Sequence, residues 1–115
     1  MTSVLLICGG DGCFKSCTAE GHAGFAAKGK DIVCASETLL LRTAVQVLES
    51  VEGIEVLIDS SRRGFLSFSV RKAVSFEDDP DLLERLRCIA DFIRTGIKSL
   101  SEEYPALVRL TEKLG

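Results

Sequence analysis

The sequence has no long apolar run. Its apolar N-terminal stretch, Val4–Cys8, has five residues. Such a stretch is too short for the core of a signal peptide and far too short to span a membrane. The chain also lacks low-complexity segments and internal repeats. These absences predict a cytoplasmic protein without a repeat architecture.

An excess of basic residues is also missing. Lysine and arginine number 14 against 17 aspartates and glutamates, which gives a formal charge of −3 and an isoelectric point near 5.2. Because nucleic acid is usually bound by a clustered basic face, we expect no direct nucleic-acid partner. A mildly acidic surface suits a basic peptide partner better. The pair Arg62 and Arg63 is interpreted as a solvent-exposed turn.

Metal-binding and redox motifs are absent as well. His22 is the only histidine, and Cys8, Cys13 and Cys17 lack the paired two-residue spacing of zinc sites. The absence of a Cys-x-x-Cys pair argues against a thiol redox protein. An odd count of five cysteines without a secretory signal argues against a disulfide framework. We therefore expect free thiols, no metal and no cofactor, with these three cysteines and Cys88 serving as core or sheet-face residues.

The pattern of apolar residues predicts an α+β fold in a single domain, residues 1–115. Alternating segments joined by glycine-containing turns indicate two hairpins. Three- and four-residue spacings indicate two helices, and Asp79 with Pro80 forms a typical helix start. The order β-β-α-β-β-α-(β) favours an antiparallel or mixed sheet packed against the two helices. We expect strands at 4–8, 13–20, 54–59, 65–70 and 107–110, and helices at 31–52 and from 80 to shortly before Pro105.

Two faces are predicted from the same periodicity. In the second strand, Phe14 should share a face with Ser16 and Thr18, opposite Cys17. The first helix should face the core with a stripe formed by Leu40, Ala44, Val47, Leu48 and Val51.

Cys34 has a local route to reactivity. If Asp31 caps the first helix, Cys34 lies in its first turn, where the partial positive charge of the helix start favours a thiolate. The Asp31 carboxylate opposes that effect. The alternative is that Cys34 has a structural role only, as a small buried hydrophobic residue.

His22 lies where the second strand gives way to a glycine-rich segment, residues 21–30, that we expect to form a mobile loop. Imidazole can take and return protons near neutral pH, as a cysteine nucleophile requires. The strand end and the helix start can be brought together without strain, which predicts a catalytic pair of Cys34 and His22. A surface or hydrogen-bonded histidine is the alternative.

A double motif carries a family resemblance. Gly21-His22-Ala23-Gly24, followed by Gly29-Lys30-Asp31-Ile32-Val33-Cys34-Ala35, resembles the signature of the ribosomal-processing cysteine protease family, Prp. The order of elements and the late Glu103-Tyr104-Pro105 are also similar, and the likeness covers essentially the whole chain.

The resemblance implies an activity and a set of site residues. Cys34 would be the nucleophile and His22 the general acid and base. The substrate would be a precursor of the twenty-seventh large-subunit ribosomal protein, cleaved after a pair of phenylalanines to remove an N-terminal extension. A homodimer is implied, as is a mobile loop over the site at residues 23–30. The residues of the substrate-binding or loop region would be Gly21, Ala23, Gly24, Phe25, Gly29 and Asp31.

The chain departs from that family at one place. After the cysteine, small residues leading to a short aliphatic residue and a serine are expected, whereas this chain has Ala35-Ser36-Glu37-Thr38. The departure concerns the groove beside Cys34 and the substrate residue that it accepts. A non-catalytic module that binds a basic ribosomal protein through the same groove is the second hypothesis.

Overall fold

The computed structural model describes residues 1–21, 28–72 and 79–115. Its elements follow the predicted order, which confirms the α+β class. They are β1 (Thr2–Cys8), β2 (Phe14–Glu20), α1 (Lys28–Glu49), β3 (Ile54–Asp59), β4 (Phe65–Lys72), α2 (Pro80–Glu103) and β5 (Val108–Leu114).

The five strands form one mixed sheet in the order β3-β4-β2-β1-β5. Antiparallel pairs join β1 to β2, β2 to β4 and β3 to β4, whereas β5 runs parallel to β1. Strand β5 is longer than the predicted 107–110, because it pairs with β1 from Thr2 to Cys8. Its polar second half is compatible with an edge strand that is partly exposed to water.

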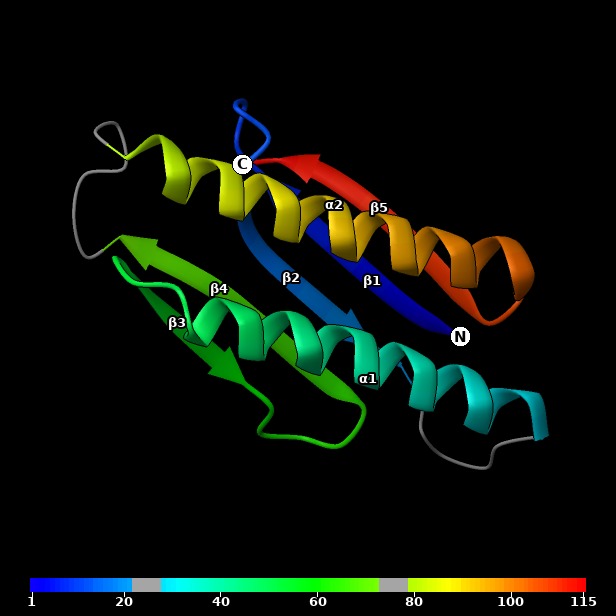
Figure 1. The fold of residues 1–115 in the computed structure, drawn as a ribbon. Helices are drawn as coiled ribbons and strands as arrows, with labels where there is room; N and C mark the ends of the chain where they lie inside the picture. Colours follow the sequence, from blue (N-terminus) through cyan, green and yellow to red (C-terminus); the bar gives the residue numbers. More distant parts are fainter. Residues whose placement is uncertain (22–27, 73–78) are drawn as a thin grey trace.

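Both helices cover the same face of the sheet (Figure 1). Helix α2 contacts β5, β1 and β2, and helix α1 contacts α2 and β3. Apolar side chains of the sheet and of the helices pack together as the core. Removing their surface from water favours the folded state. The largest fully buried members of the core include Phe14, Phe68, Leu6, Leu41, Leu48, Leu86, Ile93 and Ile97.

A β-bulge places Phe14 in this core. The pairing of β1 with β2 shifts between Ile7–Ser16 and Cys8–Phe14, so one extra residue lies on β2. The extra residue turns Phe14 to the buried side, where its ring stacks on Phe68 with centroids 5.5 Å apart. The prediction that Phe14 lies opposite Cys17 was therefore wrong, because strict alternation does not account for a bulge.

Helix α1 is shifted from its predicted bounds. It begins at Lys28 and ends at Glu49, and the chain turns at Gly53, whose φ is +90°. The buried stripe contains Val33, Glu37, Leu41, Ala44, Val45 and Leu48, whereas Leu40 is half-buried and Val47 is 45% exposed. Ala44, Leu48 and Val51 confirm the predicted stripe, whereas Val47 was wrong. The buried stripe begins earlier, at Val33, and includes Glu37, a charged residue that a search for apolar residues passes over.

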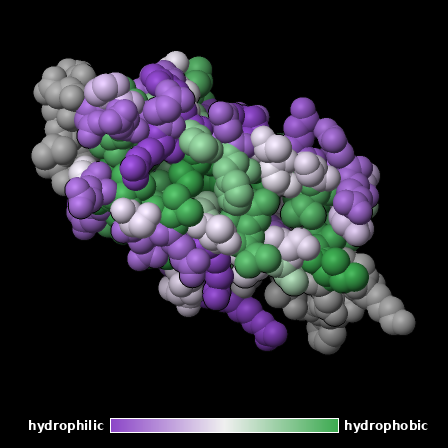
Figure 2. Space-filling view, viewed as in Figure 1, coloured by the Kyte–Doolittle hydropathy of each residue, from purple (hydrophilic) through white to green (hydrophobic). Residues whose placement is uncertain are grey.

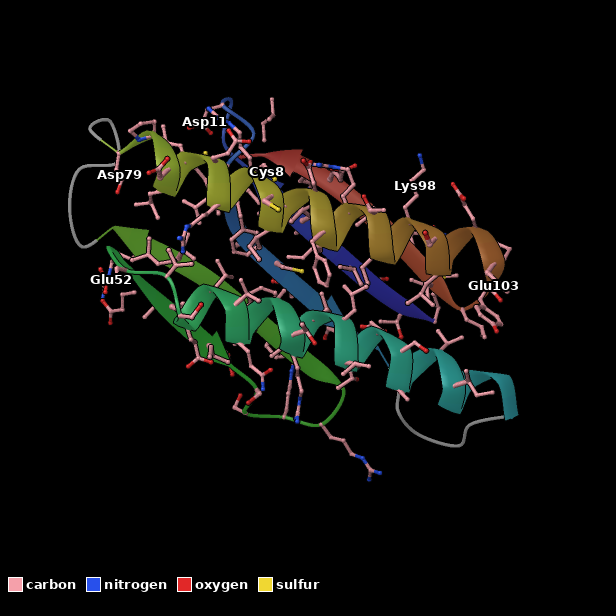
Figure 3. The ribbon with its side chains drawn as sticks, viewed as in Figure 1. Cys8, Asp11, Glu52, Asp79, Lys98 and Glu103 are labelled. Carbon is pink, nitrogen blue, oxygen red and sulfur yellow. The ribbon has the colours of Figure 1, made fainter. Side chains whose placement is uncertain are left out.

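Helix α2 confirms its predicted start. The Asp79 carboxylate accepts hydrogen bonds from the amides of Asp81 and Leu82, both at 3.1 Å. Figure 3 labels Asp79 and Glu103 at the two ends of this helix. Because Pro80 lacks an amide proton and has a fixed φ, it suits the first helical position.

The helical face is partly apolar at its surface. Figure 2 shows apolar side chains over the helices between hydrophilic ones. Leu39 is 70% exposed and Phe92 is 43% exposed.

Neither described helix is long and apolar enough to cross a membrane.

Candidate active site

A pocket of about 320 Å³ lies beside the first half of α1. It is lined by the start of β1, the end of β2, the part of α1 between Cys34 and Arg42, and the turn that joins β3 to β4. These segments are distant in sequence, and the sheet order brings them together. The volume is typical of a small ligand pocket.

Cys34 is the cysteine that lines this pocket, and it is half-buried. Cys8, Cys13 and Cys17 are buried under the helices, and burial raises the pKa of all three thiols, that of Cys17 to about 12. Cys88 is exposed on α2. A nucleophile must be able to reach the substrate, so Cys34 is the candidate that the structure favours.

The predicted role of Asp31 as a helix cap is wrong. Helix α1 begins at Lys28, so Gly29 and Asp31 lie inside its first turn rather than in a loop or at the cap. Cys34 consequently lies in the second turn. The effect of a helix dipole fades within the first turn, so the helix start gives Cys34 less help than the sequence indicated.

The predicted partner of Cys34 lies outside the described residues. His22, Ala23, Gly24 and Phe25 belong to the range 22–27, which the structure does not describe. Gly21, the residue before His22, does line the pocket.

Gly21 is glycine for a packing reason. A Cβ atom at this position would lie 2.7 Å from the Thr2 Cα and 3.0 Å from the Met1 carbonyl oxygen. Backbone atoms cannot yield as a flexible side chain can. The Gly21 amide donates to the Gly64 carbonyl at 2.9 Å, which ties the end of β2 to the turn before β4. The pocket therefore depends on close backbone approach at this point.

Glu37 is a site residue that pattern analysis did not identify. It lies three residues after Cys34, lines the same pocket and is only 6% exposed. Burial raises the pKa of Glu37 to about 7, and a hydrogen bond from the Thr2 hydroxyl opposes that shift. The signal was available in the sequence, because Glu37 belongs to the segment that departs from the family pattern.

Replacing Glu37 by glutamine is expected to remove a pH dependence from folding stability. A carboxyl with a raised folded-state pKa contributes stability below its unfolded pKa, and this contribution is lost as pH rises through the folded value. Between the ordinary value of 4.5 and about 7, wild-type stability should fall by roughly 3 kcal/mol relative to Glu37→Gln. Urea unfolding at about pH 5 and pH 8 would measure the difference. Glu102→Gln changes an exposed glutamate and serves as the control; parallel pH profiles of wild type and Glu37→Gln would contradict the prediction.

No group of three or more histidine, cysteine or carboxylate side chains that could hold a metal occurs among the described residues.

An accessible thiol in a pocket of an α+β domain is compatible with a cysteine-dependent hydrolase. The sequence model of one family, described as Cysteine protease Prp, matches residues 1–109. The chain therefore belongs to the Prp family of cysteine proteases, which confirms the predicted family and enzyme class.

Individual relatives agree with this assignment. The ribosomal processing cysteine protease Prp of Bacillus subtilis is 25% identical over 95 residues, which are 82% of this chain and 81% of that protein. Among solved structures, SMU.848 from Streptococcus mutans aligns with a TM-score of 0.75 and 23% identity over 100% of this chain and 96% of that one. The ribosomal processing protease Prp from S. aureus, solved with a substrate peptide, has a TM-score of 0.76 and 20% identity over 98% and 100% of the two chains. These two likenesses show that the fold is shared.

Proposed function

We propose that this chain is an endopeptidase that removes the N-terminal extension of a large-subunit ribosomal protein, the twenty-seventh, with Cys34 as nucleophile and His22 as general acid and base. The observation that carries the proposal is the position of Cys34. It is half-buried in a pocket wide enough for part of a peptide, whereas none of the other four cysteines lines that pocket.

The proposed reaction is an acyl transfer in two steps. The Cys34 thiolate attacks the scissile carbonyl, the carbon–nitrogen bond breaks, and His22 donates a proton to the departing amine. Water then gives a proton to His22, and its oxygen attacks the thioester. The carbon–sulfur bond breaks, which releases the new carboxylic acid, which ionises in water, and restores the Cys34 thiolate and the protonated His22. His22 follows Gly21 directly in the sequence, and Gly21 lines the pocket, which supports this pairing.

The relatives support the substrate class. The B. subtilis relative is named for ribosomal processing, and the S. aureus relative has also been solved with a covalently linked product peptide. Cleavage after an aromatic pair, contacts from Gly21, Ala23, Gly24, Phe25, Gly29 and Asp31, and a cytoplasmic homodimer belong to the same proposal.

Incubation with two forms of the substrate tests this function. The precursor of the ribosomal protein from the same organism and the same protein without its extension would be mixed with the enzyme and analysed by intact mass. We expect one cut in the precursor, after the aromatic pair, and no cut in the shortened form. Binding without a mass change would contradict the proposal and favour a non-catalytic binding module.

A further inference from the structure

We infer that the pocket beside Cys34 selects a peptide that carries a carboxylate three or four residues from the scissile bond, and that Arg42, Arg62 and Arg63 form the site that binds it. The inference deepens the proposed function and rests on it, because the scissile bond is placed at Cys34.

The charge of the pocket is opposite to that of the whole chain. Three arginines and one acidic residue, Glu37, line it, and Arg62 is paired with Glu20. Arg42 and Arg63 therefore supply the excess of positive charge, whereas the protein has a formal charge of −3. None of the three arginines forms an ion pair with Glu37 within the described part of the chain. Local positive potential in a cleft concentrates ligands of negative charge.

One of these arginines is anchored. The Nη2 atom of Arg62 lies 2.9 Å from the Glu20 carboxylate, and its guanidinium lies 4.4 Å above the ring centre of Phe65. These two contacts hold the turn between β3 and β4 against the end of β2, and they orient one positive group at the pocket.

The other two arginines have available guanidinium groups. Arg42 and Arg63 are exposed, and neither forms an ion pair with a carboxylate whose side chain the structure describes. They belong to two different elements that line the pocket, α1 and the β3–β4 turn. A guanidinium fork matches the two oxygens of a carboxylate, so this pair suits an aspartate or glutamate side chain.

Helix geometry sets the spacing. Arg42 follows Cys34 by eight residues on α1, which corresponds to about 12 Å along the helix axis. An extended peptide rises roughly 3.3 Å per residue. For a peptide that runs along α1 from Cys34, a carboxylate three or four residues from the scissile bond would lie level with Arg42.

The inference also changes which part of a ribosomal precursor should occupy the pocket. A basic segment would be repelled by Arg42 and Arg63, so the expectation that an acidic surface receives a basic peptide does not apply here. The removable extension should carry the acid, or the acid should lie just beyond the cut.

Matched peptides test the inference. A series would place one glutamate, or glutamine as its neutral counterpart, three or four residues before or after the scissile bond. At low salt, we expect one glutamate placement to raise kcat/KM about fivefold to tenfold, through KM, in line with one or two exposed ion pairs. The preference should shrink below about twofold in roughly 0.5 M NaCl, where charges are screened.

Substitutions then assign the effect to its residues. The double variant Arg42→Gln, Arg63→Gln should lose the preference for glutamate. Arg85→Gln removes a positive charge from a different pocket, which includes the start of α2. This variant should keep the preference for glutamate. Equal cleavage of glutamate and glutamine peptides by wild type, or a preference that survives in the double variant, would overturn the inference.

A binding measurement separates this inference from the proposed function. If wild type cleaves no peptide, the proposed function fails. Anisotropy with labelled peptides and the Cys34→Ala variant still reports the preference, because binding does not need the sulfur. Tighter binding of the glutamate peptide would support the carboxylate site, and equal binding or no binding would overturn it.

Discussion

Replacement of Cys34 by alanine is expected to reduce turnover by at least about 10³-fold. Without the sulfur, no acyl-enzyme forms, and only binding and backbone contacts remain to accelerate hydrolysis. Because Cys34 is half-buried at a pocket, the variant should keep its fold. The measurement is the initial rate of precursor cleavage, with circular dichroism and thermal unfolding to verify the folded state.

Cys88→Ala is the matched control for this result. Cys88 is exposed on α2 and does not line the pocket, so its loss should leave the rate within about twofold, as expected of a surface substitution. His22→Ala should resemble Cys34→Ala, since the proposed mechanism needs both residues in the same step. Wild-type rates in Cys34→Ala would show that another group performs the reaction.

Replacement of Phe68 by alanine is expected to cost about 3–5 kcal/mol of unfolding free energy. Phe68 is 1% exposed and lies on β4 between β3 and β2, with its ring stacked on Phe14. The truncation leaves a cavity under both helices that close packing cannot refill. A loss of that size is a large share of the total stability of a small domain, and urea unfolding would measure it.

Phe92→Ala is the corresponding control on the surface. Its ring is 43% exposed on α2, so the same truncation removes less buried area and should cost about 1 kcal/mol. Similar losses of unfolding free energy at Phe68 and Phe92 would contradict the expectation that the cost follows the burial of the ring.

Local chemistry made much of the fold predictable. Asp79 and Pro80 mark a helix start through their own hydrogen bonding and backbone geometry, and the structure confirms it. The bulge before Phe14 and the full length of β5 depend on a partner strand. Periodicity within one segment contains no information about such a partner.

The site was predictable only in part. Cys34 stood out by its motif, and the structure places it on a pocket. Sequence analysis did not identify Glu37 and Arg63 as pocket residues, and the reason differs between the two. A buried carboxylate interrupts the apolar pattern by which burial is recognised, and an arginine in a turn is ordinarily solvated. Their common location follows from the sheet order, which brings the turn before β4 close to α1.

The walls of the pocket come from distant parts of the chain, so we expect the pocket to form late in folding. Its lining runs from Thr2 to Leu66 in the sequence, and β4 must pair with β2 before the last wall is in place. A chain in which Cys34 has been synthesised but β4 has not yet paired with β2 has the thiol without the complete pocket. Such an intermediate lacks part of the surface that would hold a peptide, so we expect cleavage to require the completed sheet.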